Sequence, residues 1–184
     1  MGWIEHVRES LHRALSAALD LDPESTEALK RIIPAYIENA TNTQAPRNVD
    51  LCYYAVSPDP GTDLDYIQTS TKIENGSPVG VLKKSIPADV ILTFYGPHAD
   101  DDSEKVWSAL QWDYGAGSPR AVLRARKIVL RGKPQRPEGL YETEGTYQRR
   151  RCDIRLEIVY LEETARPVPT VDVPPAVTVV RNES

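Results

Sequence analysis

The run YQRRRCDIRLEIVYL, residues 147–161, decides the fold more than any other stretch of this chain of 184 residues. Apolar side chains alternate with charged or polar ones along it, which is the two-residue period of a β-strand with one buried face. One face holds Cys152, Ile154, Leu156, Ile158 and Tyr160, and the other holds Arg149, Arg151, Asp153, Arg155 and Glu157. We therefore expect a long strand whose apolar face lies in the core and whose charged face meets water or a partner.

A second run, ADVILTFY at residues 88–95, has bulky side chains on both of its faces. Such a strand is typical of the middle of a sheet, where both faces are covered. Shorter runs rich in β-forming residues predict strands at residues 49–56, 64–74, 79–84 and 127–131. Glycine, proline and glutamate predict a loop over residues 132–146.

Two helices are expected before the first strand. Residues 3–18 repeat apolar side chains every three or four positions, which is the spacing of an amphipathic helix. Asp22 and Pro23 suit the N-cap and the first position of a second helix over residues 23–40. Pro34 lies inside this second helix and should kink it or split it.

A pair of helices is expected between the strands of the second half. Asp101 and Glu104 resemble a capping box, and acids at that position favour the positive end of a helix dipole. The helix that they open is expected to bury Val106, Trp107, Leu110 and Tyr114. Ser118 and Pro119 then predict the cap and the first residue of a short second helix.

The order of these elements predicts an α+β fold. The sheet should be antiparallel or mixed, with the helices packed mainly on one face and the first helices at the N-terminus. We expect a single domain over residues 1–162, followed by an extended C-terminal arm over residues 163–184.

The composition of the arm is unusual for a solvated tail. Its four prolines oppose a helix and an ordinary central strand. Its recurrent valines favour docking on a partner, for example by adding a strand to the sheet of another subunit, and a disordered tail is the alternative interpretation. The candidate contact residues of the arm are Val168, Val171, Val173, Val177 and Val179.

The net charge of −5 conceals a segregation of charge along the chain. Residues 1–118 carry 9 Lys and Arg against 18 Asp and Glu, residues 119–155 carry 11 against 4, and residues 156–184 carry 2 against 5. A basic segment on an acidic body is typical of a nucleic-acid-binding surface or of a subunit whose basic side meets the acidic side of its neighbour. We favour the second interpretation, because aromatic residues do not alternate with the basic ones as they do in a stacking platform.

The sequence contains no recognisable motif of enzyme chemistry. It lacks a glycine-rich phosphate loop and a Gly-x-Ser-x-Gly turn. Cys52 and Cys152 lie in alternating apolar runs, which favours two buried free thiols over a disulfide. His6, His12 and His98 do not have the spacing of metal ligands. We therefore expect no enzyme, no metal and no cofactor, and the lack of a run of about 18 apolar residues predicts no membrane span.

Charged residues are the remaining candidates for function. The inter-subunit contact candidates are Arg149, Arg151, Arg155, Asp100, Asp101 and Asp102. The three arginines share a strand face and are expected to meet acids, most usefully on a neighbouring copy, with phosphate binding as the alternative. Two turn-rich loops are candidate surfaces towards other components, through Asp59, Asp63, Lys133 and Arg136.

Residues 88–162 resemble a known family in the succession of their elements. A strand ends in Phe94-Tyr95-Gly96, a helix that opens with acids holds Trp107 and Leu110, and the strand Ile128-Val129-Leu130 precedes the long strand that begins at Arg149-Arg150-Arg151. This succession is similar to the neck or tail-terminator (tail-completion) proteins of tailed bacteriophages. The likeness covers most of residues 25–162 and lies in the pattern of the fold, without a chemical signature.

The resemblance implies a structural virion protein that forms a ring, a hexamer in the family, which caps the tail tube and joins it to the head-side connector. The implied partners are further copies of the chain, the tail-tube protein and the connector or stopper protein, with the sheath protein as a further candidate. Double-stranded DNA would pass through the lumen without specific binding. The implied location is the virion tail or neck, and the host cytoplasm during assembly. A nucleic-acid-binding α+β domain that uses residues 120–155 is the alternative function.

Overall fold

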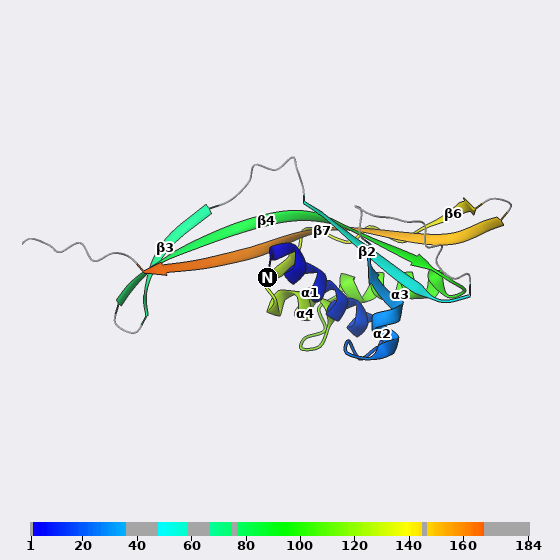
Figure 1. Ribbon diagram of the computed structural model, residues 1–184, viewed down its shortest axis with the longest axis horizontal. Coiled ribbons are helices and arrows are strands. Elements are labelled where there is room, and N and C mark those ends of the chain that lie inside the picture. Colours follow the sequence, from blue (N-terminus) through cyan, green and yellow to red (C-terminus); the bar gives the residue numbers. More distant parts are fainter. Residues whose placement is uncertain (1, 36–47, 59–66, 75–76, 145–146, 168–184) are drawn as a thin grey trace, which may run out of the picture.

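A computed structural model describes residues 2–35, 48–58, 67–74, 77–144 and 147–167. Within these ranges the chain forms one mixed sheet of seven strands and four helices, which confirms the predicted α+β class. The elements are α1 (Trp3–Ala18), α2 (Thr26–Arg31), β1 (Ile32–Pro34), β2 (Leu51–Pro58), β3 (Ile67–Glu74), β4 (Ser77–Tyr95), α3 (Ala99–Gln111), α4 (Pro119–Ala125), β5 (Ile128–Leu130), β6 (Glu138–Glu144) and β7 (Tyr147–Pro167). The helices lie together on one face of the sheet (Figure 1).

The sheet is organised around β4 and β7, which pair along nearly their whole length, from Val79 opposite Pro167 to Tyr95 opposite Arg151. The strand order is β1-β2-β4-β7-β5, with β3 beside one end of β4 and β6 beside the other end of β7. β1 runs parallel to β2, and the other pairs are antiparallel. Two ends of the sheet follow from this order: the β3 end (β3 with residues 77–84 and 161–167) and the β6 end (β6 with residues 147–153). Figure 1 shows the β3 end projecting well beyond the helices.

The strand β4 is longer than the sequence predicts. The runs at 79–84 and 88–95 are parts of one strand of 19 residues that passes through Pro87. Along this edge of β4, β3 pairs with residues up to Lys84 and β2 pairs with residues from Ala88 onward. Among the residues that the structure describes, residues 85–87 therefore pair only with β7. A proline, which has no N–H to donate, is tolerated at such a position.

The strand β7 also exceeds its predicted limit at residue 161. It continues to Pro167 because residues 162–167 pair with residues 79–84 of β4. Residues 163–167, which we assigned to the C-terminal arm, therefore belong to the sheet. The arm valines from Val168 onward lie outside the described residues.

The core lies between the helices and the sheet, as the alternation of the strands predicts. The even-numbered residues of β7 that were expected to be buried are buried from Cys152 to Ile158, and Phe94 of β4 is 1% exposed. From the helical side, the core receives Val7, Leu11 and Leu15 of α1 and Val106 and Leu110 of α3. Each such side chain stabilises the fold by about 1.5–3 kcal/mol through its removal from water.

The second helix is much shorter than predicted. It spans six residues and begins at Thr26, because Ser25 and not Asp22 is the N-cap, with its hydroxyl accepting the Ala28 N–H at 3.1 Å. Asp22 instead accepts the N–H of Glu24 within the preceding turn. From Ile32 the chain becomes extended and pairs in parallel with β2, where β-branched residues and Pro34 fit better than in a helix. The remainder of the predicted helix, residues 36–40, lies outside the described residues.

The two later helices show opposite outcomes for their predicted caps. α4 begins as predicted, because Ser118 accepts the Ala121 N–H at 3.2 Å and Pro119 takes the first turn. α3 begins at Ala99, so the capping box of Asp101 and Glu104 is wrong. A residue from another segment provides the hydrogen-bond acceptor at the start of α3, since the Asp50 carboxylate accepts the N–H of His98 at 2.9 Å. The approach of this segment requires Gly96, which has φ +112° and where a Cβ would collide with Asp50.

The predicted loop at residues 132–146 contains the strand β6, which pairs with residues 147–153 of β7. The segment before it also follows the edge of β7, with the N–H of Arg131 donating to the backbone carbonyl of Glu157 and the N–H of Gln135 donating to the backbone carbonyl of Arg155. Glutamate and glycine have low strand propensity, and the prediction failed because the open edge of β7 provides the hydrogen-bond partners that override it.

Candidate assembly surfaces

The predicted contact arginines Arg149, Arg151 and Arg155 of β7 lie on the helix-free face of the sheet, as the alternation predicts. Arg151 forms two hydrogen bonds with Asp153 on the same strand, Nε to Oδ1 at 2.8 Å and Nη2 to Oδ2 at 2.6 Å. The hydrogen bonds to Asp153 raise the pKa of Arg151 further above its already high value. Arg155 is exposed. Arg151, one of the predicted contact arginines, is thus engaged with an acid of its own chain.

An aromatic and charged cluster surrounds Tyr95 at the β6 end. The Arg149 guanidinium lies 4.1 Å from the centre of the Tyr95 ring, and Tyr53 packs edge-on against the same ring at 5.9 Å. The Tyr95 hydroxyl donates to Glu142 at 3.0 Å. Burial and this hydrogen bond raise the pKa of Tyr95 to about 12. These contacts fix side chains of the four strands β2, β4, β6 and β7 relative to one another.

The acidic cluster at the start of α3 also finds partners within the chain. Asp100 forms an ion pair with Arg150 at 2.6 Å, and Asp102 forms one with Arg31. Asp101 is exposed. The structure therefore brings Asp100 to the one arginine of the triplet that we did not select, and the predicted contacts between copies stay predictions.

Both cysteines are buried free thiols, which confirms the prediction. Cys152 donates from Sγ to Asp100 Oδ1 at 2.8 Å. Burial and this hydrogen bond raise the pKa of Cys152 to about 11, and burial raises the pKa of Cys52 as well. Neither thiol is therefore activated as a nucleophile at neutral pH.

The two loop candidates have different outcomes. Asp59 and Asp63 lie outside the described residues. Lys133 and Arg136 lie on the segment that follows the edge of β7, where Trp107 Nε1 and Gln111 Nε2 donate to the carbonyl of Pro134 at 3.2 and 3.3 Å. The segment is thus attached to α3, and Lys133 and Arg136 project from it as exposed side chains.

Most arginines of the basic segment have a carboxylate within 4.0 Å from elsewhere in the chain. The pairs are Arg124 with Asp113, Arg126 with Glu9, Arg131 with Glu157, Arg136 with Glu104, Arg150 with Asp100 and Arg151 with Asp153. A phosphate group would have to compete with these carboxylates for each arginine.

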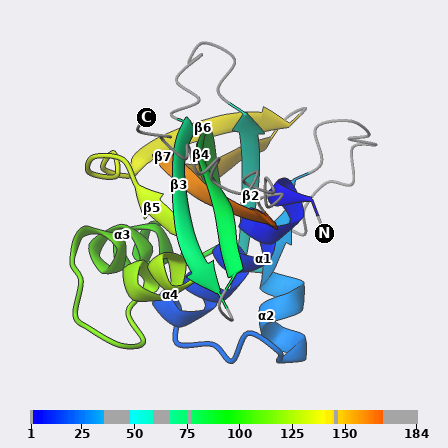
Figure 2. The ribbon, with the colours of Figure 1, turned by 90° about the vertical axis from the view of Figure 1, so that its left-hand side faces the viewer.

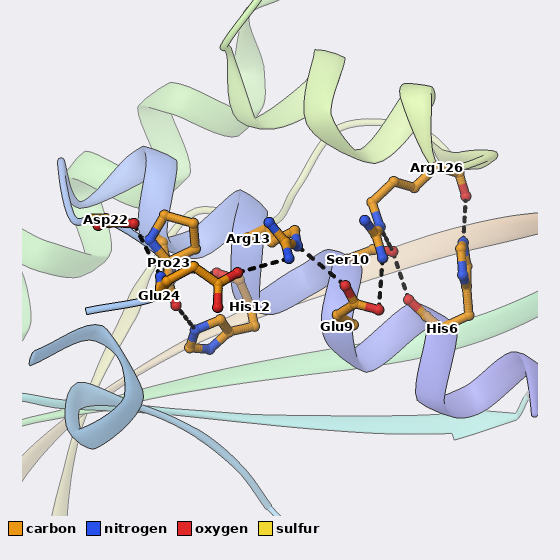
Figure 3. A network of polar contacts seen from close by, with 10 residues as sticks. His6, Glu9, Ser10, His12, Arg13, Asp22, Pro23, Glu24 and Arg126 are labelled. Carbon is orange, nitrogen blue, oxygen red and sulfur yellow. Dashed lines mark hydrogen bonds and ion pairs between the residues drawn. The ribbon is translucent and has the colours of Figure 1, made fainter. Parts of the chain in front are cut away.

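A polar network on α1 accounts for two of the three histidines (Figure 3). His6 donates to the carbonyl of Arg126 and His12 to that of Pro23, both at 3.0 Å. Arg126 also contacts Glu9 at 2.8 Å. Slight burial opposes the ionised form of Glu9, but hydrogen bonds and charge from Arg13 and Arg126 lower its pKa. These histidines therefore connect α1 to α4 and to the turn before α2.

Sequence analysis missed an exposed aromatic loop between α3 and α4. Tyr114 was expected to be buried in a helix, but α3 ends at Gln111, and Trp112 and Tyr114 are each 66% exposed. Gly115 and Gly117 have positive φ and turn the chain between the two helices. Two aromatic residues directly before a Gly-x-Gly turn were the signal that could have indicated a loop.

Apolar side chains are also exposed at both ends of the sheet. At the β3 end, Ile73 is 77% and Leu82 is 41% exposed. At the β6 end, Leu140 and Tyr141 are exposed. Exposed apolar groups that recur at defined places, rather than singly, are typical of interaction surfaces.

The described residues contain no group of three or more His, Cys, Asp or Glu side chains arranged to hold a metal ion. No helix within the described ranges has the length and apolar character needed to span a membrane. No protein-family model matches the sequence, and no curated protein gives a significant match to it.

Proposed function

We propose that this protein is a structural virion subunit, a tail terminator or neck protein of a tailed bacteriophage that assembles as a ring. The observation that carries the proposal is the sheet itself. Its two central strands have 19 and 21 residues and extend past the helices at the β3 end (Figure 1), and apolar side chains of β3, β4 and β6 are exposed at the two ends of the sheet. The resemblance in the succession of elements over residues 88–162 supports the same conclusion.

Projecting strands of this kind are poorly suited to a protein that acts alone. Narrow β-ribbons without a covering layer are marginally stable in water, so they gain from contact with another surface. At the β3 end, Ile73 and Leu82 would become buried in such a contact, and at the β6 end Leu140 and Tyr141 would. Exposed apolar side chains at two separate ends of a sheet are expected in a subunit that contacts neighbours on several sides.

In the proposed assembly a hexameric ring caps the tail tube and connects it to the head-side connector or stopper protein, with the sheath protein as a further candidate neighbour. The net charge of −5 suits the wall of a passage for double-stranded DNA, because such a wall should not hold phosphate groups. The protein would assemble in the host cytoplasm and remain in the virion.

Native mass spectrometry of the purified protein, alone and with the tail-tube protein, tests the proposal. We expect a closed ring of defined mass, visible also by negative-stain microscopy, and a complex with the tube protein. A protomer that stays single at all concentrations and ignores the tube protein would contradict the proposal. DNA binding that weakens steeply as salt is added would instead favour the nucleic-acid-binding function.

A further inference from the structure

The connection between α3 and α4, together with α4, forms a surface that we name the basic flank (residues 112–127). It carries four basic residues, Arg120, Arg124, Arg126 and Lys127, against one acid, Asp113. Asp113 holds the loop in shape by accepting from the Gly115 N–H at 3.3 Å and the Ser118 hydroxyl at 3.1 Å, and by pairing with Arg124. Trp112 and Tyr114 are therefore exposed on a loop that is already ordered.

The turn after α1, together with most of α2, forms a second surface that we name the acidic flank (residues 20–29). It carries four acids, Asp20, Asp22, Glu24 and Glu27, and no Lys or Arg. Lys105 pairs with Asp20 and Arg13 with Glu24. Leu29 of α2 is 60% exposed beside these acids.

Charge remains uncompensated on both flanks. Within the described ranges, no Lys or Arg forms an ion pair with Asp22 or Glu27, and no carboxylate forms one with Arg120 or Lys127. Arg120 donates to the carbonyl of Gln111 at 3.3 Å, which places its guanidinium next to the start of the aromatic loop. Each flank thus combines an apolar anchor with free charge of one sign, and the signs are opposite.

The two flanks lie at opposite edges of the molecule. The sheet order places β1 at one edge and β5 at the other. α2 contacts β1 and β2, whereas α4 contacts β5. Figure 2 shows α2 on one side of the helix layer and the connection between α3 and α4 on the other side.

A single helix holds both flanks in a fixed relation. α1 contacts the end of the basic flank through Glu9 and His6, which bind Arg126. It contacts the acidic flank through Arg13, which binds Glu24, and through His12 (Figure 3). A fixed angle between two different, complementary patches determines whether a head-to-tail series of subunits closes into a ring.

From these observations we infer that the basic flank of one copy binds the acidic flank of the next copy, so that this contact joins neighbouring subunits of the ring. The inference rests on the proposed function and specifies the surfaces that build the ring. Trp112 and Tyr114 supply the aromatic anchors that dominate such interfaces, and Leu29 supplies an apolar surface to receive them. Arg120 and Lys127 would meet Asp22 and Glu27, which favours the correct pairing of faces over like-with-like contact.

Two variants of exposed residues test the inference. W112A/Y114A removes the anchors of the basic flank, and D22K/E27K reverses the charge of the acidic flank. Each variant should fold with an unchanged circular dichroism spectrum but self-associate about 10- to 100-fold more weakly, with loss of the ring mass. Ile91→Ala, which removes an exposed apolar side chain of β4 that lies outside both flanks and both sheet ends, is the control and should retain the ring.

Mixing the two variants gives the decisive result. W112A/Y114A keeps an intact acidic flank, and D22K/E27K keeps an intact basic flank. An equimolar mixture should therefore form heterodimers through these two flanks and nothing larger. If the wild-type protein forms rings and both variants do so as well, or if the mixture forms no heterodimer, the inference is overturned while the proposed function stands. If the wild-type protein stays a single protomer at all concentrations, both fail together.

Discussion

The two ends of the sheet are built from the same pair of long strands, but different interactions hold them. At the β6 end, Asp153 is nearly buried and binds Arg151 with two hydrogen bonds, and Tyr95 gathers Arg149 and Glu142 around its ring. At the β3 end, the ion pair of Lys72 and Glu163 measures 3.7 Å between exposed side chains. The β6 end also contacts α3 through Asp100, whereas Figure 1 shows no helix under the β3 end.

This difference teaches how one sheet can serve two purposes. A charge pair with a buried carboxylate fixes its neighbours, because breaking the pair leaves a partly buried charge that has lost its hydrogen bonds. Exposed ion pairs and exposed apolar side chains contribute little until another surface covers them. We interpret the β6 end as preformed and the β3 end as the part that gains most from assembly.

The largest expected effect contrasts the helix-covered middle of the sheet with the β3 end. Phe94→Ala should lower the free energy of unfolding by about 3–5 kcal/mol, because it opens a cavity in the core. Leu82→Ala lies on the same strand in an exposed position and should lower it by at most about 1 kcal/mol. Urea denaturation of the two variants under identical conditions measures both values, and losses of similar size would show that the β3 end is as well packed as the middle.

An intermediate effect contrasts the ion pairs of the two ends. Asp153→Ala should destabilise the protein by about 1.5–3 kcal/mol, because the Arg151 guanidinium loses two charged hydrogen bonds in a partly buried place. Glu163→Ala, the matched variant at the β3 end, should change stability by about 0–1 kcal/mol. Thermal or urea unfolding measures the loss of stability in both variants. An equal loss in Asp153→Ala and Glu163→Ala would show that the ion pairs of the two ends contribute equally.

The smallest expected effect concerns the turn that follows β4, next to the β6 end. His98 lies 2.9 Å from Asp50, whose hydrogen bond and charge raise the pKa of His98. A histidine with a raised pKa in the folded state stabilises the fold fully below its unfolded pKa of about 6.5, and this contribution is lost as the pH rises through the folded value.

Titration of the His98 imidazole by NMR tests this arrangement. Asp50→Asn should return its pKa towards about 6.5 and flatten the pH dependence of stability around neutrality. Asp101→Asn, which removes a more distant charge, is the control and should lower the pKa less. An unchanged titration in Asp50→Asn would show that Asp50 does not hold His98.

The candidate surfaces were only partly predictable. Alternation placed Arg149, Arg151 and Arg155 on the helix-free face, because a strand face is a property of residues two apart. It could not show that Arg150, on the other face, would meet Asp100 of α3, since the two lie 50 positions apart. The exposed aromatic loop at Trp112 was missed because apolar spacing alone suggested that α3 continued to Tyr114.

The sequence by itself determined the features that depend on neighbouring residues. Period-two alternation specified the buried face of β7, three-to-four spacing specified α1, and the Ser118-Pro119 pair specified the start of α4. The expectation that both faces of residues 88–95 are covered was wrong, because Ile91 is 39% exposed on the helix-free face. Only the tertiary structure decided where β4 and β7 end, that β6 is a strand, and that α2 stops at Arg31. The physical reason is that an extended chain forms its backbone hydrogen bonds with distant residues, so the length of a strand depends on the partner beside it.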